Sequence, residues 1–226
     1  MRSLLVGALW LAATASPAFA QVSFSSSAGA PDPGFAPNQQ LLVNFNNLNP
    51  ASYPGVSLSG NYAILNGSLP GAAAPAGVTS GFFAVPNVSG PSYGTAVIDF
   101  STYLGARSFS SLSFYWGSID SYNMLELLDA NGKALSILGT SNAGFFTGTD
   151  LVVPANGNQT SALTNRRLFL NLEATPTFRA LRLTSNGRAF EIDDIAGAMT
   201  VPEPGTLGLL GAGLIGMMTG ARRRRR

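Results

Sequence analysis

Short runs of alternating apolar and polar residues fill the chain between residues 21 and 200, and glycine, proline and asparagine separate them. In residues 111–116, for example, every second residue is Leu112, Phe114 or Trp116. Successive side chains of a β-strand point to opposite faces, so such a run covers one face of a core. No segment of this region shows the 3.6-residue period of a helix of normal length. The pattern therefore predicts an all-β fold.

About eleven segments are expected to form strands. They are residues 41–45, 56–65, 79–85, 95–100, 111–116, 123–129, 134–138, 150–153, 167–172, 180–184 and 189–192. Asn131-Gly132 predicts a hairpin turn after residue 129, because this pair tolerates positive φ. Residues 21–40 are expected to be an extended lead-in, and residues 69–77 a loop. Without long crossover helices, we predict an antiparallel two-sheet sandwich over residues 21–200, jelly-roll-like in its connectivity.

The chain contains no cysteine and no histidine, which excludes several kinds of chemistry. Disulfides, thiol catalysis, Ser-His-Asp triads and metal sites with Cys or His ligands all need these residues. Residues 21–200 hold seven basic and ten acidic residues, which gives a net charge near −3. Without a basic surface, we expect no nucleic-acid partner.

The N-terminus has the three parts of a secretory leader. Arg2 precedes an apolar stretch over residues 4–13, and Ala18-Phe19-Ala20 supplies small residues at a cleavage position. We therefore predict a signal peptide over residues 1–20 that signal peptidase removes before Gln21. The alternative, a structural helix, is disfavoured by Pro17.

A second targeting segment is predicted over residues 201–226. Residues 205–221 carry no charge and would form a helix about 25 Å long, a minimal membrane span for a bilayer core of roughly 30 Å. A cluster of five arginines follows, and its transfer across a membrane is costly, so it should stay on the cytoplasmic side. This cluster consists of Arg222, Arg223, Arg224, Arg225 and Arg226. The preceding domain would then lie outside the membrane.

The tail resembles the PEP-CTERM sorting signal of bacterial surface proteins. The matching parts are the Val201-Pro202-Glu203-Pro204 motif, the Gly/Leu-rich span and the arginine cluster, in this order. The resemblance implies that an exosortase-type membrane protease cuts near the Pro-Glu-Pro motif. The body would then reach the cell surface or the extracellular matrix. The alternative is a proline-rich linker before a permanent membrane anchor.

The body also resembles a family of exosortase-dependent bacterial surface proteins, from about Leu42 through the tail. The matching stretches are residues 113–123, 154–161, 164–166 and 190–195. The resemblance implies no activity, cofactor or catalytic residue. We therefore expect a non-enzymatic protein with a structural or adhesive role.

One cluster of residues suggests a sugar site. Trp116, Asp120, Tyr122 and Asn123 stand where a predicted strand ends and the chain turns. An aromatic ring can stack on a pyranose while Asp and Asn bind its hydroxyls, so a lectin-like module for an exopolysaccharide is the alternative function. The competing interpretation, which we favour, is a buried Trp116 with Asp120 and Asn123 bonded to their own turn.

Carboxylates suggest two further possibilities. Residues 190–195 look like the final strand of carbohydrate-binding jelly rolls, and Asp193 and Asp194 offer the hard oxygen donors that calcium prefers. Two carboxylates do not complete a site of six to eight ligands, so we expect no cofactor unless structural calcium binds there. Glycoside hydrolysis needs two carboxylates, but no spacing pairs the candidates, so we expect no enzyme activity. The candidates are Asp99, Asp120, Glu126, Glu173 and Glu191.

Overall fold

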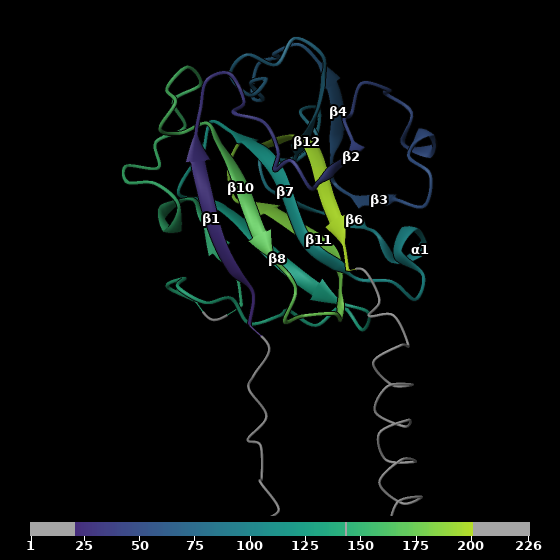
Figure 1. The fold of residues 1–226 in the computed structure, drawn as a ribbon. Helices are drawn as coiled ribbons and strands as arrows, with labels where there is room; N and C mark the ends of the chain where they lie inside the picture. The colour runs from purple at the N-terminus through teal and green to yellow at the C-terminus, as the bar shows by residue number, and fades with distance from the viewer. Residues whose placement is uncertain (1–20, 143, 201–226) are drawn as a thin grey trace, which may run out of the picture.

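The computed structural model describes residues 21–142 and 144–200, and this part of the chain folds into two antiparallel β-sheets (Figure 1). The larger sheet has the order β1 (Ser23–Ala28), β10 (Arg166–Asn171), β7 (Phe109–Gly117), β12 (Phe190–Met199), β5 (Gly81–Val85) and β4 (Ala63–Asn66), and β2 (Gln40–Val43) also pairs with β12. The smaller sheet has the order β3 (Ser57–Gly60), β6 (Gly94–Asp99), β11 (Phe178–Ser185), β8 (Asn123–Asp129) and β9 (Phe146–Thr147).

Helix content is very low, as the sequence predicts. The described residues contain the four-residue helix α1 (Ser101–Leu104) and two 3₁₀ turns, η1 (Pro50–Ser52) and η2 (Gly148–Asp150). The all-β, two-sheet prediction is confirmed. The jelly-roll connectivity stays a prediction.

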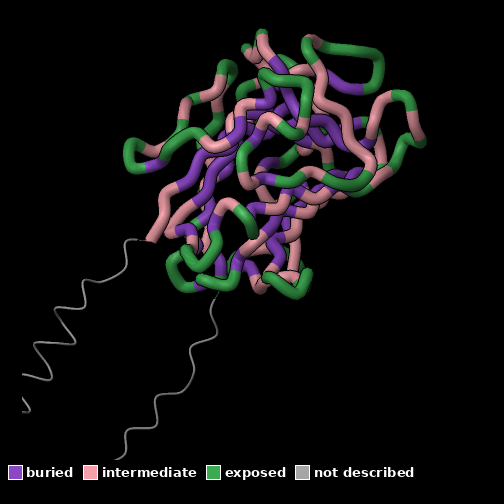
Figure 2. The backbone as a smooth tube through the Cα atoms, turned by 90° about the vertical axis from the view of Figure 1, so that its right-hand side faces the viewer, coloured by how far each residue is buried: buried purple, intermediate pink, exposed green. Residues whose placement is uncertain are grey.

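The core lies between the two sheets, where the alternating runs place their apolar sides. Leu112, Phe114 and Trp116 of β7 are fully buried in it, together with Leu125 of β8 and Leu183 of β11. Figure 2 shows buried backbone through the middle of the molecule and exposed loops at its rim. Burial of apolar surface at about 25 cal/mol per Å² is the main force that holds the sheets together.

The central strand β7 sets the layout of the outer face of the larger sheet. Arg167 of β10 and Asp193 of β12 are both register partners of Tyr115, one on each side of β7. Register partners on adjacent strands share a face, and this row lies opposite the core-facing Leu112, Phe114 and Trp116. A charged and polar row therefore crosses three strands on the outer face.

Two segments cover part of this outer face: residues 29–39, here named the strap, and residues 69–78. The Tyr115 hydroxyl lies 2.7 Å from the carbonyl oxygen of Gly29 in the strap and 2.9 Å from that of Ala76, and its one proton is shared between them. Gly117 lets the second segment approach, because a Cβ at this position would lie 2.7 Å from Pro75. The outer face is therefore partly buried under loops.

Several predicted strand boundaries need correction. Residues 56–65 form two strands in different sheets, because the chain turns at Gly60, which has φ +95°. Residues 134–138 make only isolated bridges, such as Leu128 with Ala134, and form no strand. Residues 150–153 form no strand, because Asp150 ends the 3₁₀ turn η2 and its carboxylate accepts the N–H of Thr147 at the start of that turn.

The predicted lead-in over residues 21–40 is also wrong in part. Residues 23–28 form β1, an edge strand that pairs with all six residues of β10. The run is rich in serine and lacks clear apolar alternation, so its strand character depends on the partner strand. In Figure 1, β1 begins and β12 ends at the same lower end of the sandwich.

Candidate functional site

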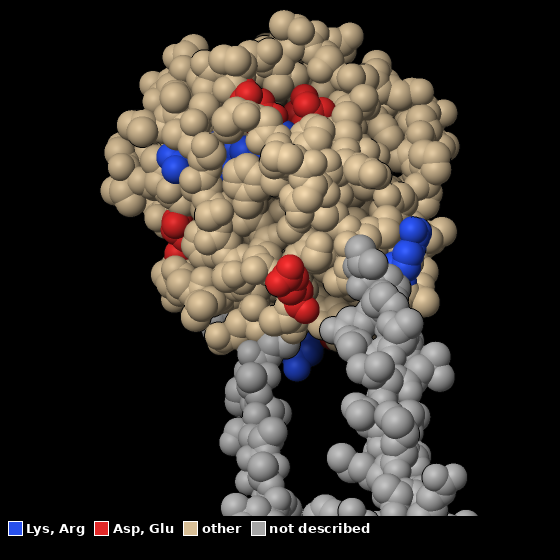
Figure 3. Space-filling view, viewed as in Figure 1, with Lys and Arg blue, Asp and Glu red and all other residues tan. Residues whose placement is uncertain are grey.

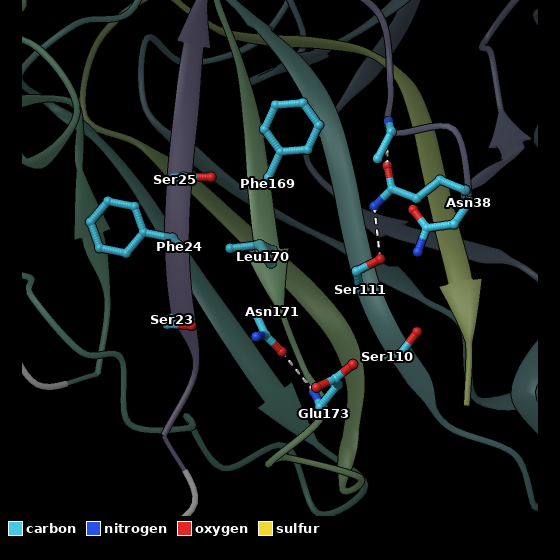
Figure 4. A pocket seen from close by; sticks show the side chains of 12 residues that line it. Ser23, Phe24, Ser25, Asn38, Ser110, Ser111, Phe169, Leu170, Asn171 and Glu173 are labelled. Carbon is cyan, nitrogen blue, oxygen red and sulfur yellow. Dashed lines mark hydrogen bonds between the residues drawn. The ribbon is translucent and has the colours of Figure 1, made fainter. Parts of the chain in front are cut away.

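A groove of about 500 Å³ opens on the outer face of the larger sheet, below the strap. Its floor comes from β1, β10 and β7, and one wall comes from the end of the strap (Figure 4). The volume falls within the range of small-molecule sites. The lining residues are Ser23, Phe24, Ser25, Ala36, Asn38, Gln39, Ser110, Ser111, Phe169, Leu170, Asn171 and Glu173.

The groove offers many neutral hydrogen-bonding groups and the ring of Phe169 on its floor. The ring of the other lining phenylalanine, Phe24, packs against Phe146 in the core. Phe169 is half-buried, and its ring stands over the space between β10 and β7 in Figure 4. Within the described residues, no hydrogen bond uses the side chains of Ser23, Ser25 or Asn38. Asn171 uses its amide oxygen to accept the N–H of Glu173 at 3.1 Å. These groups can serve a polar ligand.

The strap wall of the groove is fixed by a buried amide. Gln39 is 5% exposed, and its amide nitrogen donates to the Ser111 hydroxyl at 3.0 Å. Its amide oxygen accepts the Ser113 hydroxyl at 2.6 Å. The strap is therefore held to β7 beside the groove.

A buried ion pair fixes the strap more strongly. The Arg167 side chain is fully buried and donates through Nε to Oδ1 of Asp32 at 2.9 Å and through a second nitrogen to the other carboxylate oxygen. It also donates to the Ser113 hydroxyl at 3.1 Å and to the Asp194 carbonyl at 3.0 Å. Two-point pairing of this kind is among the strongest polar contacts in proteins.

Charge on this face is confined to small areas. Figure 3 shows acidic side chains close to basic atoms in the upper part of the face, while most of the remaining surface carries neither. Glu173 is the one charged residue among those that line the groove.

Two carboxyl groups are buried beside these segments. Glu191 is 2% exposed and accepts hydrogen bonds from the Ala73 N–H at 3.1 Å and the Ser118 hydroxyl at 2.9 Å. Burial raises the pKa of Glu191 to about 8. Burial, together with the adjacent charge of Asp194, raises the pKa of Asp193 to about 8. Desolvation disfavours the charged form, so both groups are predicted to be mainly protonated at neutral pH.

At the end of β7, Trp116 is buried, as the favoured interpretation predicts, and offers no platform for a sugar. Trp116 is fully buried, and its ring stacks on Phe190 with a centroid distance of 4.2 Å. Asn123 is also fully buried and donates to the Ala189 carbonyl at 3.1 Å. Neither residue can reach a ligand without unfolding, because both are enclosed by the core.

The other two residues of this predicted site come together. The Tyr122 hydroxyl lies 2.6 Å from the Asp120 carboxylate and 2.7 Å from the Arg188 carbonyl, and its one proton is shared between these acceptors. Burial raises the pKa of Asp120, and its hydrogen bond with Tyr122 opposes this shift. The pair ties the chain after β7 to the segment that precedes β12, and its use by a ligand stays a prediction.

The predicted calcium ligands lie next to the buried ion pair. Asp194 occupies a β-bulge of β12 with φ +46°, and its carbonyl is bonded to Arg167. A guanidinium already supplies positive charge at this point, which does not favour a divalent cation. In residues 21–142 and 144–200, no group of three or more acidic side chains could hold a metal ion. The calcium site stays a prediction.

Among the candidate acids for hydrolysis, Asp120 and Glu191 lie close enough for the charge of Asp120 to help raise the pKa of Glu191. The other three are held elsewhere. Glu126 of β8 forms an ion pair with Arg182 of β11, and Asp99 accepts the Ser101 N–H at 2.6 Å. Glu191 is buried beside β7, whereas Glu173 is exposed in the groove. The absence of enzyme activity stays a prediction.

The groove itself was not predicted, although the sequence contained one signal for it. In residues 166–171, the alternation that directs Leu168 and Leu170 inward directs Arg167, Phe169 and Asn171 outward. An outward phenylalanine in a strand indicates a covered or ligand-binding surface. The contribution of the strap could not be found in this way, because it depends on contacts between distant segments.

Comparison with known proteins supports the targeting segment. The sequence model of the PEP-CTERM protein-sorting motif matches residues 200–226. This motif marks an exported, membrane-anchored precursor that an exosortase processes. The match does not extend into the body, so the family resemblance from Leu42 onward is supported only at the C-terminal motif.

The other comparisons add little. No curated protein matches the chain. Among solved structures, the enzymatically active domain of tailspike protein 4 from bacteriophage CBA120 is similar over 70% of this chain, with 13% identity and a TM-score of 0.36. The aligned region spans about 20% of that structure. A similarity at this level carries no argument about function.

The predicted processing elements lie outside the described residues. These elements are the leader over residues 1–20, the motif Val201 to Pro204, the span over residues 205–221 and the arginines at 222–226. Within the described part of the chain, no helix has the length and hydrophobicity needed to cross a membrane.

Proposed function

We propose that this chain is an exported surface or extracellular-matrix protein with a non-enzymatic, structural or adhesive role. The observation that carries the proposal is the match of residues 200–226 to the PEP-CTERM sorting motif, directly after the last strand of a β-sandwich. A body that is rich in serine and asparagine and poor in charged residues suits a domain that makes hydrogen bonds outside the cell.

The proposed route has three steps. Signal peptidase removes residues 1–20 after export. The helix over residues 205–221 then holds the precursor in the inner membrane, and the arginine cluster keeps its end in the cytoplasm. An exosortase-type protease finally cuts near Glu203, and the sandwich passes to the surface or matrix.

The route can be tested by a single change in the motif. Glu203→Ala should leave full-length protein in the membrane fraction, because the protease would lose a charged recognition group. Immunoblots of membrane and released fractions would measure this retention. Glu173→Ala is the matched control, since it removes an exposed glutamate of the body. Equal release of the Glu203→Ala variant and the wild type would refute the protease-substrate proposal.

The second candidate function is a lectin-like module that binds exopolysaccharide. Burial of Trp116 removes the stacking platform first considered for it. The observation that favours this function is instead the groove, with its neutral polar lining and the Phe169 ring.

A further inference from the structure

We propose that the groove between the strap and β1, β10 and β7 binds a neutral polysaccharide chain. This inference rests on the proposed surface role and adds to it a binding site and a ligand class. Phe169 would stack on a sugar ring, and the surrounding hydroxyl and amide groups would bind the sugar hydroxyls.

The chemistry of the lining selects this ligand. Seven of the twelve lining residues are serine, asparagine or glutamine. The amide of Gln39 is bonded to Ser111 and Ser113, and the other six offer both donors and acceptors to a ligand. A sugar presents the same mixture of donors and acceptors around an apolar ring face. No lysine or arginine lines the groove, and Glu173 adds a negative charge, so phosphate, sulfate and uronate groups are disfavoured.

The outward lining groups lie in two rows that cross three strands. Ser23 and Ser25 on β1, Phe169 and Asn171 on β10, and Ser111 on β7 occupy neighbouring register positions on one face. Figure 4 shows these residues spread along the strands, with the strap residue Asn38 on the opposite side. The groups therefore form two rows across three strands, on which a short segment of a sugar chain would lie.

The backbone that holds the groove is rigid, which lowers the cost of binding. The floor consists of hydrogen-bonded strands, and the wall is fixed by the bonds of Gln39 with Ser111 and Ser113 and by the pair of Arg167 with Asp32. Few groups must become ordered when a ligand enters.

The experiment uses the full chain, purified in a mild detergent, on an array of neutral hexose oligosaccharides of about four to six units. Alginate and polygalacturonate oligosaccharides provide the acidic comparison. The expected result is binding to one or more neutral glycans and weaker or no binding to the acidic ones. Phe169→Leu should weaken that binding about tenfold or more, because it keeps apolar volume but removes the ring.

Two further variants keep the test decisive. Ser25→Arg places a long side chain in the groove from an exposed position, so binding should be lost while the thermal unfolding temperature stays unchanged. Tyr93→Ala is the matched control, because Tyr93 is an aromatic residue that is 65% exposed and lies outside the groove lining. Its binding should equal that of the wild type.

The proposal is overturned if the intact protein binds no neutral glycan, or if folded Phe169→Leu and Ser25→Arg bind as the wild type does. Preference for acidic glycans would also overturn it. The sorting assay with Glu203→Ala is independent of these measurements. If Glu203→Ala is retained in the membrane but the protein binds no neutral glycan, only the groove proposal is refuted. If the protein binds a neutral glycan but Glu203→Ala is released as the wild type is, only the sorting proposal is refuted.

Discussion

Replacement of Asp32 by alanine should reveal how strongly the strap is bound to the sheet. Asp32 receives two hydrogen bonds from Arg167, whose side chain has no exposed surface, whereas the Asp32 side chain is 19% exposed. After the change, the guanidinium keeps the Ser113 hydroxyl and the Asp194 carbonyl as partners but loses its bidentate carboxylate partner. Removal of one partner of a buried pair typically costs about 3–5 kcal/mol, because a charge is left buried and uncompensated.

The expected loss is large on the scale of a whole domain. Domains of this size are commonly stable by about 5–15 kcal/mol. With a urea m-value of about 2 kcal/mol/M, a loss of 3–5 kcal/mol would lower the unfolding midpoint by roughly 1.5–2.5 M. Intrinsic fluorescence of the buried Trp116 can follow the transition.

A second ion pair provides the control. Glu126 pairs with Arg182, but the Arg182 side chain is 34% exposed and can turn to water when its partner is removed. Glu126→Ala should therefore cost only about 1 kcal/mol or less. If Asp32→Ala costs no more than Glu126→Ala, water must reach Arg167, and the argument that the strap is held by a desolvated ion pair would be refuted.

Two other predictions concern the interior. Trp116→Ala should destabilise the protein by about 3–5 kcal/mol in urea unfolding, because it empties a core site. Trp116→Phe should cost far less, since the indole N–H has no partner in the described structure. A small loss for the alanine variant would mean that the residue is not in the core. Because burial raises the pKa values of Glu191 and Asp193 to about 8, the native state holds protons that the unfolded state releases near pH 4. Unfolding free energy should then fall by up to about 1.4 kcal/mol per pH unit per group as pH rises toward 8. Glu191→Gln should reduce this slope in urea titrations at pH 5 to 9, and an unchanged slope would contradict the raised pKa of Glu191.

The sequence determined the fold class of this protein and which side of most strands faces the core. Strand alternation is a local property, so Leu112, Phe114 and Trp116 could be placed on one face from their spacing alone. The same spacing implied that Phe169 points outward. The sorting motif at residues 200–226 is likewise a linear signal, which needs no fold to be identified.

The tertiary structure decided what covers the outward side chains. Strand spacing assigns Arg167 to the outer face, but the strap buries it completely against Asp32, 135 residues away in the chain. The serine-rich β1 becomes a strand through its pairing with β10, and together they provide much of the floor of the groove. Such contacts join segments that are distant in sequence, and no local pattern encodes them, because their stability comes from a partner that only the folded chain supplies.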